Sequence, residues 1–254
     1  MGISRRVKES AKYSNRRYIL PAFLPIDEVR KLKLAALCSG GKDGSYALWR
    51  VLEEGHEVAY IVSLIPERED SWMFHKPDSD IIEMFAEASE TPLKTRQTSG
   101  IKEEELEDLK HILKQLSIDG IVSGALASTY QKERINKICE GLGLESLTPI
   151  WHAHPFELLE NMVENGFDIL ITSVSAKGLD EGWLGRKIDP DCIGELRVLN
   201  DKWGLHPTGE GGEYETLTLD APFFRKRINI VDTEKFWEGD RGHLKIKQAE
   251  LSEK

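Results

Sequence analysis

The segment from residue 32 to residue 45 constrains this chain most, because an apolar run ends there in a glycine-rich loop. The run Leu32–Cys38 is followed by the loop Ser39-Gly40-Gly41-Lys42-Asp43-Gly44-Ser45, and helix-favouring residues begin at Tyr46. A short apolar run that stops at glycines is typical of a buried parallel strand. The segment therefore predicts a strand, a tight turn and a helix, which is the first unit of an α/β sheet.

The loop has the residue types that a phosphate-binding cradle needs. Two successive glycines let the backbone turn so that several N–H groups face one point, and the start of a helix adds positive potential. Lys42 supplies a cation for a phosphate, and Asp43 supplies a ligand for Mg²⁺. The hydroxyls of Ser39 and Ser45 can bond phosphate oxygens. An ordinary strand–turn–helix corner is the alternative interpretation.

Two better-known phosphate loops do not match this sequence. A Walker A loop needs Ser or Thr after its lysine and a glycine five places before the second one, and the chain has Asp43 and Ala36 at these positions. The GxGxxG pattern of dinucleotide-binding domains is also missing from the loop. The loop is therefore a cradle of another type.

Hydrophobic patterns alternate between strand and helix along the first 148 residues. Apolar runs predict strands at 58–62, near 93 and at 120–123, and helical spacing predicts helices at 46–52, 78–89, 102–116 and 130–141. Such an alternation indicates an α/β fold, a parallel sheet with helices on both faces.

The pattern changes after Pro149. Helices are predicted at 155–165 and 190–202, a strand at 167–172, a loop at 175–186, and period-two strands at 216–219, 227–231 and 244–246. Period-two strands are typical of an antiparallel sheet with one wet face. We therefore predict a nucleotide-binding domain at 33–148, a smaller mixed α+β domain at 149–254 and a basic extension at 1–32.

Charge is unevenly distributed along the chain. Residues 1–33 carry nine basic and three acidic side chains, whereas the remaining residues carry 25 basic and 41 acidic ones, a net charge of −16. A body with this charge is a poor general binder of nucleic acid, so no direct nucleic-acid partner is expected. The basic segment is either a mobile solubilising extension, an overlong start, or an arm that touches RNA or an acidic partner.

The apolar runs and the cysteines indicate in which cellular compartment the protein is expected. No run approaches the roughly 20 residues that a membrane span needs, so no membrane association is expected. The three cysteines, Cys38, Cys139 and Cys192, are far apart and form no CxxC pair. They are interpreted as small buried hydrophobes in a reducing cytoplasm. The sequence leaves both a monomer and a homodimer open.

The loop resembles the PP-loop of N-type ATP pyrophosphatases, usually written SGGxDS, with Gly44 at the place of the final serine and Ser45 one step later. Three further stretches, in this order and spacing, are similar to the diphthine–ammonia ligase family. They are Gly124–Arg134 (GALASTYQKER), Gly178–Arg186 (GLDEGWLGR) and Gly209–Phe224 (GEGGEYETLTLDAPFF). The resemblance covers about residues 33–235 and implies a HUP-type parallel sheet with a family-specific C-terminal domain.

The resemblance also implies an activity. The family completes diphthamide synthesis by amidating the diphthine carboxylate on translation elongation factor 2 with ammonium. The implied route uses ATP and Mg²⁺, passes through an acyl-adenylate and releases AMP and pyrophosphate. Free ammonium is expected, because an N-terminal-nucleophile glutaminase would need cysteine where the chain has Gly2. Two alternatives stay open: a small-molecule carboxylate as acceptor, or a HUP protein that binds adenine nucleotide without turnover.

The predicted site residues divide into nucleotide and acceptor sets. Lys42 and Asp43 are the predicted catalytic residues, with Asp43 also the metal ligand. The residues predicted to bind ATP are Ser39, Gly40, Gly41, Lys42, Asp43, Gly44, Ser45, His75, Gly124, Ser128, Gln131 and Arg134. The stretch that begins at Gly124 belongs to this set because it follows a predicted strand and should lie at the carboxyl edge of the sheet. For Arg134 the alternative is an exposed helix charge, and for His75 an exposed or structural histidine.

Carboxylates and aromatics make up the predicted acceptor set. The residues predicted to bind the acceptor are Trp183, Arg186, Glu210, Gly211, Gly212, Glu213, Tyr214 and Glu215. The trimethylammonium group of diphthine is cationic and suits such side chains. The alternatives are that the glutamates are merely solvated and that Trp183 only plugs the junction between domains. The pair His152 and His154 has the spacing of a strand metal site but no third ligand.

Overall fold

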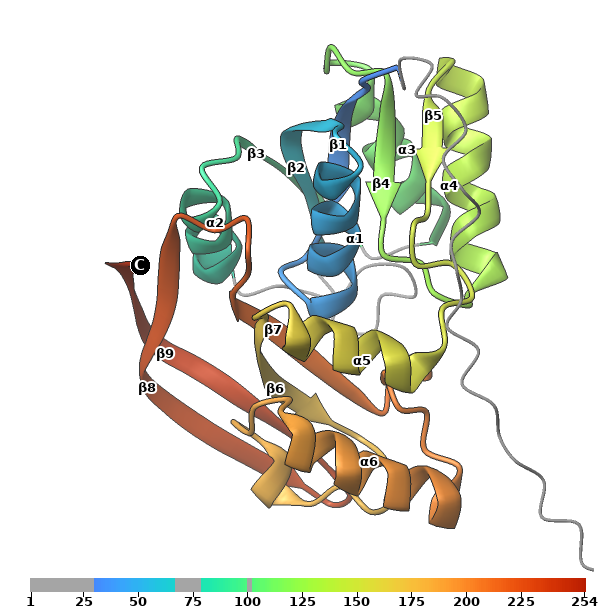
Figure 1. Cartoon of the computed structure of the whole chain (residues 1–254). Helices are drawn as coiled ribbons and strands as arrows, with labels where there is room; N and C mark the ends of the chain where they lie inside the picture. Colours follow the sequence, from blue (N-terminus) through green and yellow to red (C-terminus); the bar gives the residue numbers. More distant parts are fainter. Residues whose placement is uncertain (1–29, 67–78, 100–101) are drawn as a thin grey trace, which may run out of the picture. The chain divides into compact units, whose positions relative to one another are not determined.

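The computed structural model describes residues 30–66, 79–99 and 102–254 (Figure 1). Residues 31–254 form one compact unit. His75 and nearly all of the predicted basic extension lie outside the described residues. In the part of the chain that is described, no helix has the length and apolar character that crossing a bilayer requires.

A five-stranded parallel sheet is built from the first half of the chain. Its strands are β1 (Lys33–Leu37), β2 (Glu57–Pro66), β3 (Leu93–Thr98), β4 (Gly120–Ser123) and β5 (Glu145–Leu147), in the order β3-β2-β1-β4-β5. Four helices connect them: α1 (Lys42–Glu53), α2 (Ser79–Ala88), α3 (Lys102–Leu113) and α4 (Thr129–Leu142). This architecture confirms the predicted HUP-type α/β sheet.

The central strand places the glycine loop at the point where the strand order reverses. Leu37, the last residue of β1, pairs with Val62 of β2 on one side and with Ser123 of β4 on the other. In open parallel sheets, ligands bind outside the carboxyl ends of the strands at such a reversal. The loop that follows β1 therefore lies where a nucleotide site is expected.

Separate apolar cores form around this sheet. One core contains Leu34, Leu48 and Phe85, and it continues into the second half of the chain. The other contains Ala35, Leu109 and further buried side chains of α3 and α4. Adjacent residues of β1 thus belong to different cores, as the alternation of side chains along a strand requires.

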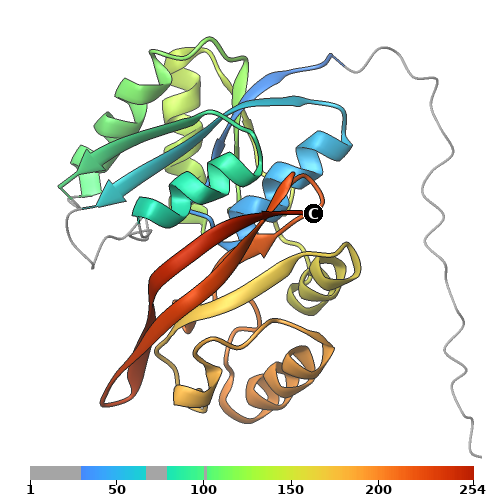
Figure 2. The same ribbon diagram turned by 90° about the vertical axis from the view of Figure 1, so that its left-hand side faces the viewer.

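The second half of the chain forms an antiparallel sheet (Figure 2). Its strands are β6 (Asp168–Val174), β7 (Tyr214–Asp220), β8 (Lys226–Glu238) and β9 (Arg241–Glu253), in the order β7-β6-β9-β8. The helical elements are α5 (Pro155–Glu164), the 3₁₀ turn η1 (Glu181–Trp183) and α6 (Pro190–Trp203). The antiparallel sheet confirms the predicted mixed α+β character.

Strands β8 and β9 are longer than predicted, and β5 was not predicted. Each strand of the hairpin has 13 residues. Most of β8 beyond Ile228 is exposed, so its outer half lacks the buried side that produces a period-two apolar signal. The short β5 has only three residues, and none of its side chains is fully buried.

Aromatic side chains join the two halves. The rings of Tyr46 and Trp49 on α1 lie 5.4 Å and 5.7 Å from that of Phe167, which precedes β6. On α2, the ring of Phe85 meets that of Phe224 edge-on at 5.0 Å. Buried aromatic pairs of this kind contribute roughly 0.5–1.5 kcal/mol beyond the area they bury.

Candidate active site

The glycine loop turns between β1 and α1 in a conformation that its residues dictate. Gly40 has a φ of +89°, the left-handed region that favours glycine. Gly41 is the N-cap of α1 and provides no side-chain cap. The first N–H groups of a helix have no intrahelical acceptor. The Thr216 hydroxyl takes the N–H of Lys42, and an anion can bind to the other N–H groups of this first turn. The loop therefore has the geometry of a phosphate cradle.

Gly124 lies against this first turn of α1. A Cβ at position 124 would stand 2.5 Å from the carbonyl carbon of Asp43 and 2.5 Å from the nitrogen of Gly44. Both neighbours are backbone atoms, which cannot move aside as the end of a side chain can. Glycine at 124 thus permits the end of β4 to approach the loop.

A pocket opens at the carboxyl ends of β1, β2 and β4. Residues from all three strands and from α4 line it: Leu37, Cys38, Ser39, Gly44, Val62, Ser63, Leu64, Ser123, Gly124, Ala125, Gln131 and Ile135. Of the residues predicted to bind ATP, this pocket brings together Ser39, Gly44, Gly124 and Gln131.

Two buried hydroxyls in this pocket were missed at the sequence level. Ser63 is 3% exposed and Ser123 is 5% exposed, and in the described part of the chain neither hydroxyl has a hydrogen-bond partner. A buried polar atom without a partner is expensive unless a ligand or water satisfies it. The available signal was a single serine inside each apolar strand, in Ile61–Ile65 and in Ile121–Ser123.

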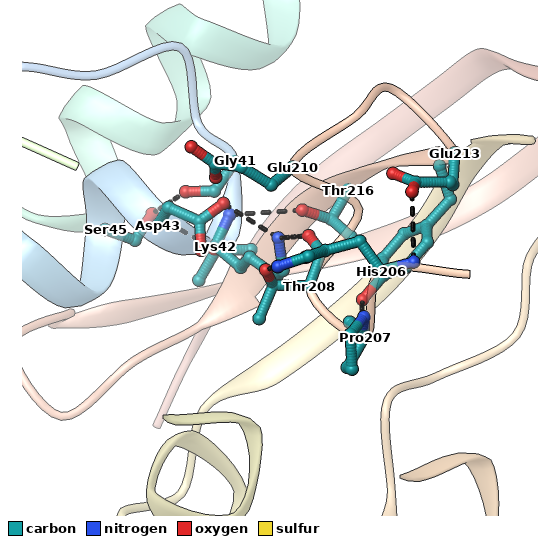
Figure 3. Close-up of polar contacts among 12 residues, drawn as sticks. Gly41, Lys42, Asp43, Ser45, His206, Pro207, Thr208, Glu210, Glu213 and Thr216 are labelled. Carbon is teal, nitrogen blue, oxygen red and sulfur yellow. Dashed lines mark hydrogen bonds and ion pairs between the residues drawn. The ribbon is translucent and has the colours of Figure 1, made fainter. Parts of the chain in front are cut away.

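Lys42 is turned toward the antiparallel sheet and is buried (Figure 3). Its Nζ donates hydrogen bonds to the carboxylate of Asp43, at 2.7 Å, and to the backbone carbonyl of Thr208. The same ammonium lies 5.4 Å from the centroid of the Tyr214 ring. The backbone N–H of Lys42 donates to the Thr216 hydroxyl at 3.2 Å. Residues of β7 and the preceding loop therefore complete the surroundings of this lysine.

Asp43 has one carboxylate oxygen with a partner and one without. Oδ2 accepts from Lys42, whereas Oδ1 is buried and has no hydrogen-bond partner in the described part of the chain. Mg²⁺ is usually held by one or two carboxylates together with substrate phosphates. The free Oδ1 fits one position of such a shell.

No larger metal cluster is present within the described ranges. Groups of three or more His, Cys, Asp or Glu with metal-binding geometry are absent there. The His152–His154 pair lies where the chain turns into α5. His152 adopts a left-handed φ of 59°, its N–H donates to the Leu126 carbonyl, and His154 is the N-cap of α5.

The hydroxyl of Ser45 faces the protein, which corrects the prediction that it contacts phosphate. Ser45 is fully buried, and its Oγ donates to the Gly41 carbonyl at 2.8 Å and accepts from the Thr218 hydroxyl at 3.0 Å. Ser45 therefore joins the loop to β7. It does not take the place of the serine that the PP-loop pattern has at position 44.

Ser128, which precedes α4, and Arg134, which lies on α4, both make contacts within the protein. Ser128 is the N-cap of α4, and its side chain accepts from the Gln131 N–H at 3.3 Å. The guanidinium of Arg134 lies 3.4 Å from the centroid of the Tyr130 ring. Ser128 thus stabilises the helix start, and Arg134 covers a tyrosine one turn away and does not line the pocket.

Glu213 and Tyr214 are committed to the loop that precedes β7. The Glu213 carboxylate accepts from the N–H groups of His206, at 3.0 Å, and Gly211, at 2.8 Å. Tyr214 is buried, and its hydroxyl donates to the Pro207 carbonyl. Burial raises the pKa of this phenol well above its ordinary value. Both side chains are thus engaged within the protein, and acceptor binding by them stays a prediction.

Glu210, another residue of the predicted acceptor set, extends from this loop toward the start of α4. Its Oε1 accepts from the Ala127 N–H at 3.2 Å, just before α4. Glu215 lies half-buried on β7, and Gly211 and Gly212 are exposed. The loop thus spans from the antiparallel sheet to the carboxyl edge of the parallel sheet.

Trp183 and Arg186 are held within the second half of the chain. Trp183 is buried in the core, which favours the plugging role over acceptor binding. Arg186 lies over its ring and forms two hydrogen bonds to Glu195, at 2.8 and 2.9 Å. This contact raises the pKa of the guanidinium and lowers that of the Glu195 carboxyl. Both side chains are thus engaged within the second half of the chain, and their acceptor roles stay predictions.

The three cysteines are buried thiols. Burial raises the pKa values of Cys38, Cys139 and Cys192 to about 11 each. A thiol with such a pKa is almost entirely protonated at neutral pH and is a poor nucleophile. The interpretation of these residues as small hydrophobes is confirmed.

Comparison with known proteins identifies the family. A model of the diphthamide synthase N-terminal domain matches residues 32–146, and one of the C-terminal domain matches residues 154–251. A protein from Rattus norvegicus named diphthine–ammonia ligase is 35% identical over 227 residues, which cover 80% of this chain and 84% of that protein. The chain belongs to the diphthamide synthase family. The name of these relatives denotes a carbon–nitrogen ligase.

Other members of the diphthamide synthase family differ in length. The human diphthine–ammonia ligase is 34% identical and is covered to 84%. The one from Schizosaccharomyces pombe is 35% identical over 238 residues, but the chain spans only 39% of that protein. Among solved structures, a predicted subunit of a tRNA methyltransferase from Methanocaldococcus jannaschii covers 75% of this chain with a TM-score of 0.42 and 14% identity.

Proposed function

We propose that this protein amidates the diphthine carboxylate of translation elongation factor 2 with ammonium, using MgATP and releasing AMP and pyrophosphate. Membership of the diphthamide synthase family supports the acceptor and the ligase reaction. The arrangement that carries the proposal is the PP-loop beside a pocket at the carboxyl edge of the sheet. A cytoplasmic location is part of the proposal.

The chemistry explains why ATP is needed. A carboxylate resists attack because its charge repels the nucleophile and an oxide is a bad leaving group. Transfer of AMP to the carboxylate gives an acyl-adenylate, whose leaving group is a stable phosphate. Ammonia then attacks the acyl carbon, the amide forms, and AMP leaves. Pyrophosphate departs in the first step, so its growing negative charge must be stabilised by the protein and Mg²⁺.

Different residues of the site would serve the separate parts of this reaction. The N-terminus of α1 would receive the phosphates, and Lys42 would balance the charge that develops on pyrophosphate. Asp43, whose Oδ1 has no partner in the described residues, would hold Mg²⁺, which when bound would supply positive charge against the departing pyrophosphate. The hydroxyls of Ser63 and Ser123 would form hydrogen bonds with polar groups of the nucleoside.

Free ammonium is the proposed nitrogen donor. A glutaminase that hydrolyses glutamine by covalent catalysis needs an activated nucleophile, usually a thiolate. All three thiols of the chain are buried, and their pKa values lie near 11. None of them is suited to generate ammonia from glutamine.

The acceptor is proposed to bind at the loop that precedes β7. This loop carries Glu210, whose carboxylate reaches the Ala127 N–H just before α4, and Glu215 follows the loop on β7. Carboxylates at this position suit the trimethylammonium group of diphthine by charge. The loop also contacts Lys42 through the Thr208 carbonyl, so an acceptor bound there would lie next to the reacting phosphates.

Incubation with ATP, Mg²⁺, ammonium and diphthine-bearing elongation factor 2 tests the proposal. We expect AMP and pyrophosphate to form in step with amidated factor, which is lighter by the mass difference between a hydroxyl and an amino group. ADP as the product would contradict the PP-loop assignment. Turnover with a small carboxylic acid but not with the factor would contradict the proposed acceptor.

A further inference from the structure

We infer that Glu213 is a positioning residue for Lys42 and acts through the loop between residues 206 and 211. The inference rests on the proposed function, because it assigns a role in the ATP-dependent step to a carboxylate that does not touch the nucleotide pocket. Lys42 is the residue through which it acts. Hydrogen bonds lead from Glu213 to the loop and from the loop to the lysine.

The Glu213 carboxylate closes the loop on itself. One oxygen accepts from the N–H of His206 and the other from the N–H of Gly211, so both ends of the loop are held by one side chain. The backbone carbonyl of Glu213 accepts from the Ser175 N–H at 2.8 Å. Glu213 is thus fixed to the end of β6 while it shapes the loop.

The loop in turn holds the ammonium of Lys42. The Thr208 carbonyl, which lies between the two N–H groups that Glu213 binds, accepts a hydrogen bond from Nζ (Figure 3). Thr208 is 1% exposed, and its hydroxyl pairs with Nδ1 of His206 at 3.0 Å. The Tyr214 hydroxyl donates to the neighbouring Pro207 carbonyl. The position of this carbonyl is therefore determined by the loop that Glu213 closes.

Two fixed acceptors give the lysine a defined direction. A protonated lysine has three N–H donors and no acceptor. Asp43 and the Thr208 carbonyl take two of these donors, so the third points in one direction. A donor that is aimed in advance stabilises developing charge without reorganisation during the reaction. Loosening the loop should therefore lower the rate of the chemical step more than the affinity for substrates.

Two variants weaken the hydrogen bonds between Glu213 and the loop in different ways. Glu213→Gln replaces one acceptor oxygen by an amide NH₂, which cannot accept from a backbone N–H. Gly211→Ala keeps the carboxylate but adds a Cβ 3.0 Å from Glu213 Oε1, so the carboxylate must shift. Glu164→Gln and Gly194→Ala are matched controls, because Glu164 is exposed and a Cβ at Gly194 meets nothing within 4 Å.

Chemical labelling tests the link between Glu213 and Lys42 without substrates and without enzymatic turnover. Acetic anhydride at limiting concentration should modify Lys42 slowly in the wild type, because its side chain is 4% exposed, whereas Lys187 is 58% exposed. Both loop variants should raise the rate at Lys42 several-fold while the rate at Lys187 stays constant. Unchanged protection of Lys42 in a folded Glu213→Gln variant would overturn the inference.

Steady-state kinetics with the diphthine-bearing factor tests whether Glu213 positions Lys42 for the chemical step. We expect both variants to lower kcat about tenfold, the size of one charge-assisted hydrogen bond, with the KM values for ATP and the factor nearly unchanged. A higher KM for the factor at constant kcat would mean recognition instead of positioning and would overturn the inference. A wild type that binds ATP but does not amidate the factor would refute the proposed function alone, and the labelling result would still decide the link.

Discussion

The backbone N–H of Thr218 donates a hydrogen bond of 2.8 Å to the carbonyl of Gly40. This contact joins β7 of the antiparallel sheet to the PP-loop of the parallel sheet. The Thr216 hydroxyl and the Ser45 hydroxyl add further hydrogen bonds between the same two segments. The PP-loop is therefore shaped from both halves of the chain, and changes in either half should affect it.

Substitution of Gly124 should disrupt the loop from the side of β4. Because a Cβ there would stand 2.5 Å from backbone atoms of Asp43 and Gly44, Gly124→Ala must displace the first turn of α1. We expect a loss of about 1–3 kcal/mol in the free energy of unfolding and clearly weaker MgATP binding by calorimetry. Gly141→Ala, where a Cβ meets nothing within 4 Å, should bind MgATP normally; equal affinities in the two variants would refute the close approach.

Removal of the Lys42 ammonium should abolish most of the activity. Lys42→Ala deletes a donor that is directed by two acceptors, and the loss of one such donor lowers kcat by roughly a hundred- to a thousandfold. Circular dichroism should show a folded protein. Wild-type rates of pyrophosphate release in this variant would contradict the cradle.

The pocket hydroxyls should matter for ligand binding and not for folding. Within the described ranges neither Ser63 nor Ser123 has a hydrogen-bond partner to lose, so Ser63→Ala and Ser123→Ala should leave the free energy of unfolding unchanged or higher. Each should weaken ATP binding by roughly two- to tenfold, the size of one neutral hydrogen bond. Thr98→Val is the control, because Thr98 is buried, its hydroxyl has no partner among the residues that the structure describes, and it lies outside the pocket lining. Unaltered ATP affinity in both serine variants would remove these residues from the site.

Restoring serine at position 44 should crowd the loop. A Cβ at Gly44 would lie 3.1 Å from the Cys38 Sγ and 3.3 Å from the Leu37 carbonyl oxygen. Gly44→Ser should therefore lower the free energy of unfolding by about 1–3 kcal/mol. Adding Cys38→Ala removes the nearest atom and should recover part of this loss relative to Cys38→Ala alone. A Gly44→Ser variant as stable as the wild type would show that the loop has more room.

Stability should fall at alkaline pH because of the buried thiols. Burial raises the pKa values of Cys38, Cys139 and Cys192 to about 11, whereas thiols of the unfolded chain ionise near pH 8.5. The protonated thiols stabilise the fold fully below that pH, and the contribution is lost as the pH rises toward 11. Urea unfolding at pH 7.5, 9 and 10 should show a decline, and a variant with all three cysteines replaced by alanine should show a shallower one. Equal slopes would contradict the assignment.

The parallel sheet and the PP-loop were predictable because their signals are local. An apolar run, two glycines and an amphipathic helix follow one another directly in residues 32–52. The roles of Glu213 and Arg186 were not predictable, since each depends on partners fixed by the fold. Glu213 binds the N–H of His206 only because the chain turns back between them. Arg186, in the loop before α6, binds Glu195 on that helix.

An oxygen-18 label distinguishes an acyl-adenylate route from other routes to the amide. Elongation factor 2 carrying diphthine with an oxygen-18-labelled carboxylate is incubated with the protein, MgATP and ammonium, and the AMP is analysed by mass spectrometry. An acyl-adenylate route predicts that one carboxylate oxygen leaves with AMP, so AMP acquires oxygen-18 in the same amount as amide forms. Unlabelled AMP together with amidated factor, or ADP as the nucleotide product, would contradict the account.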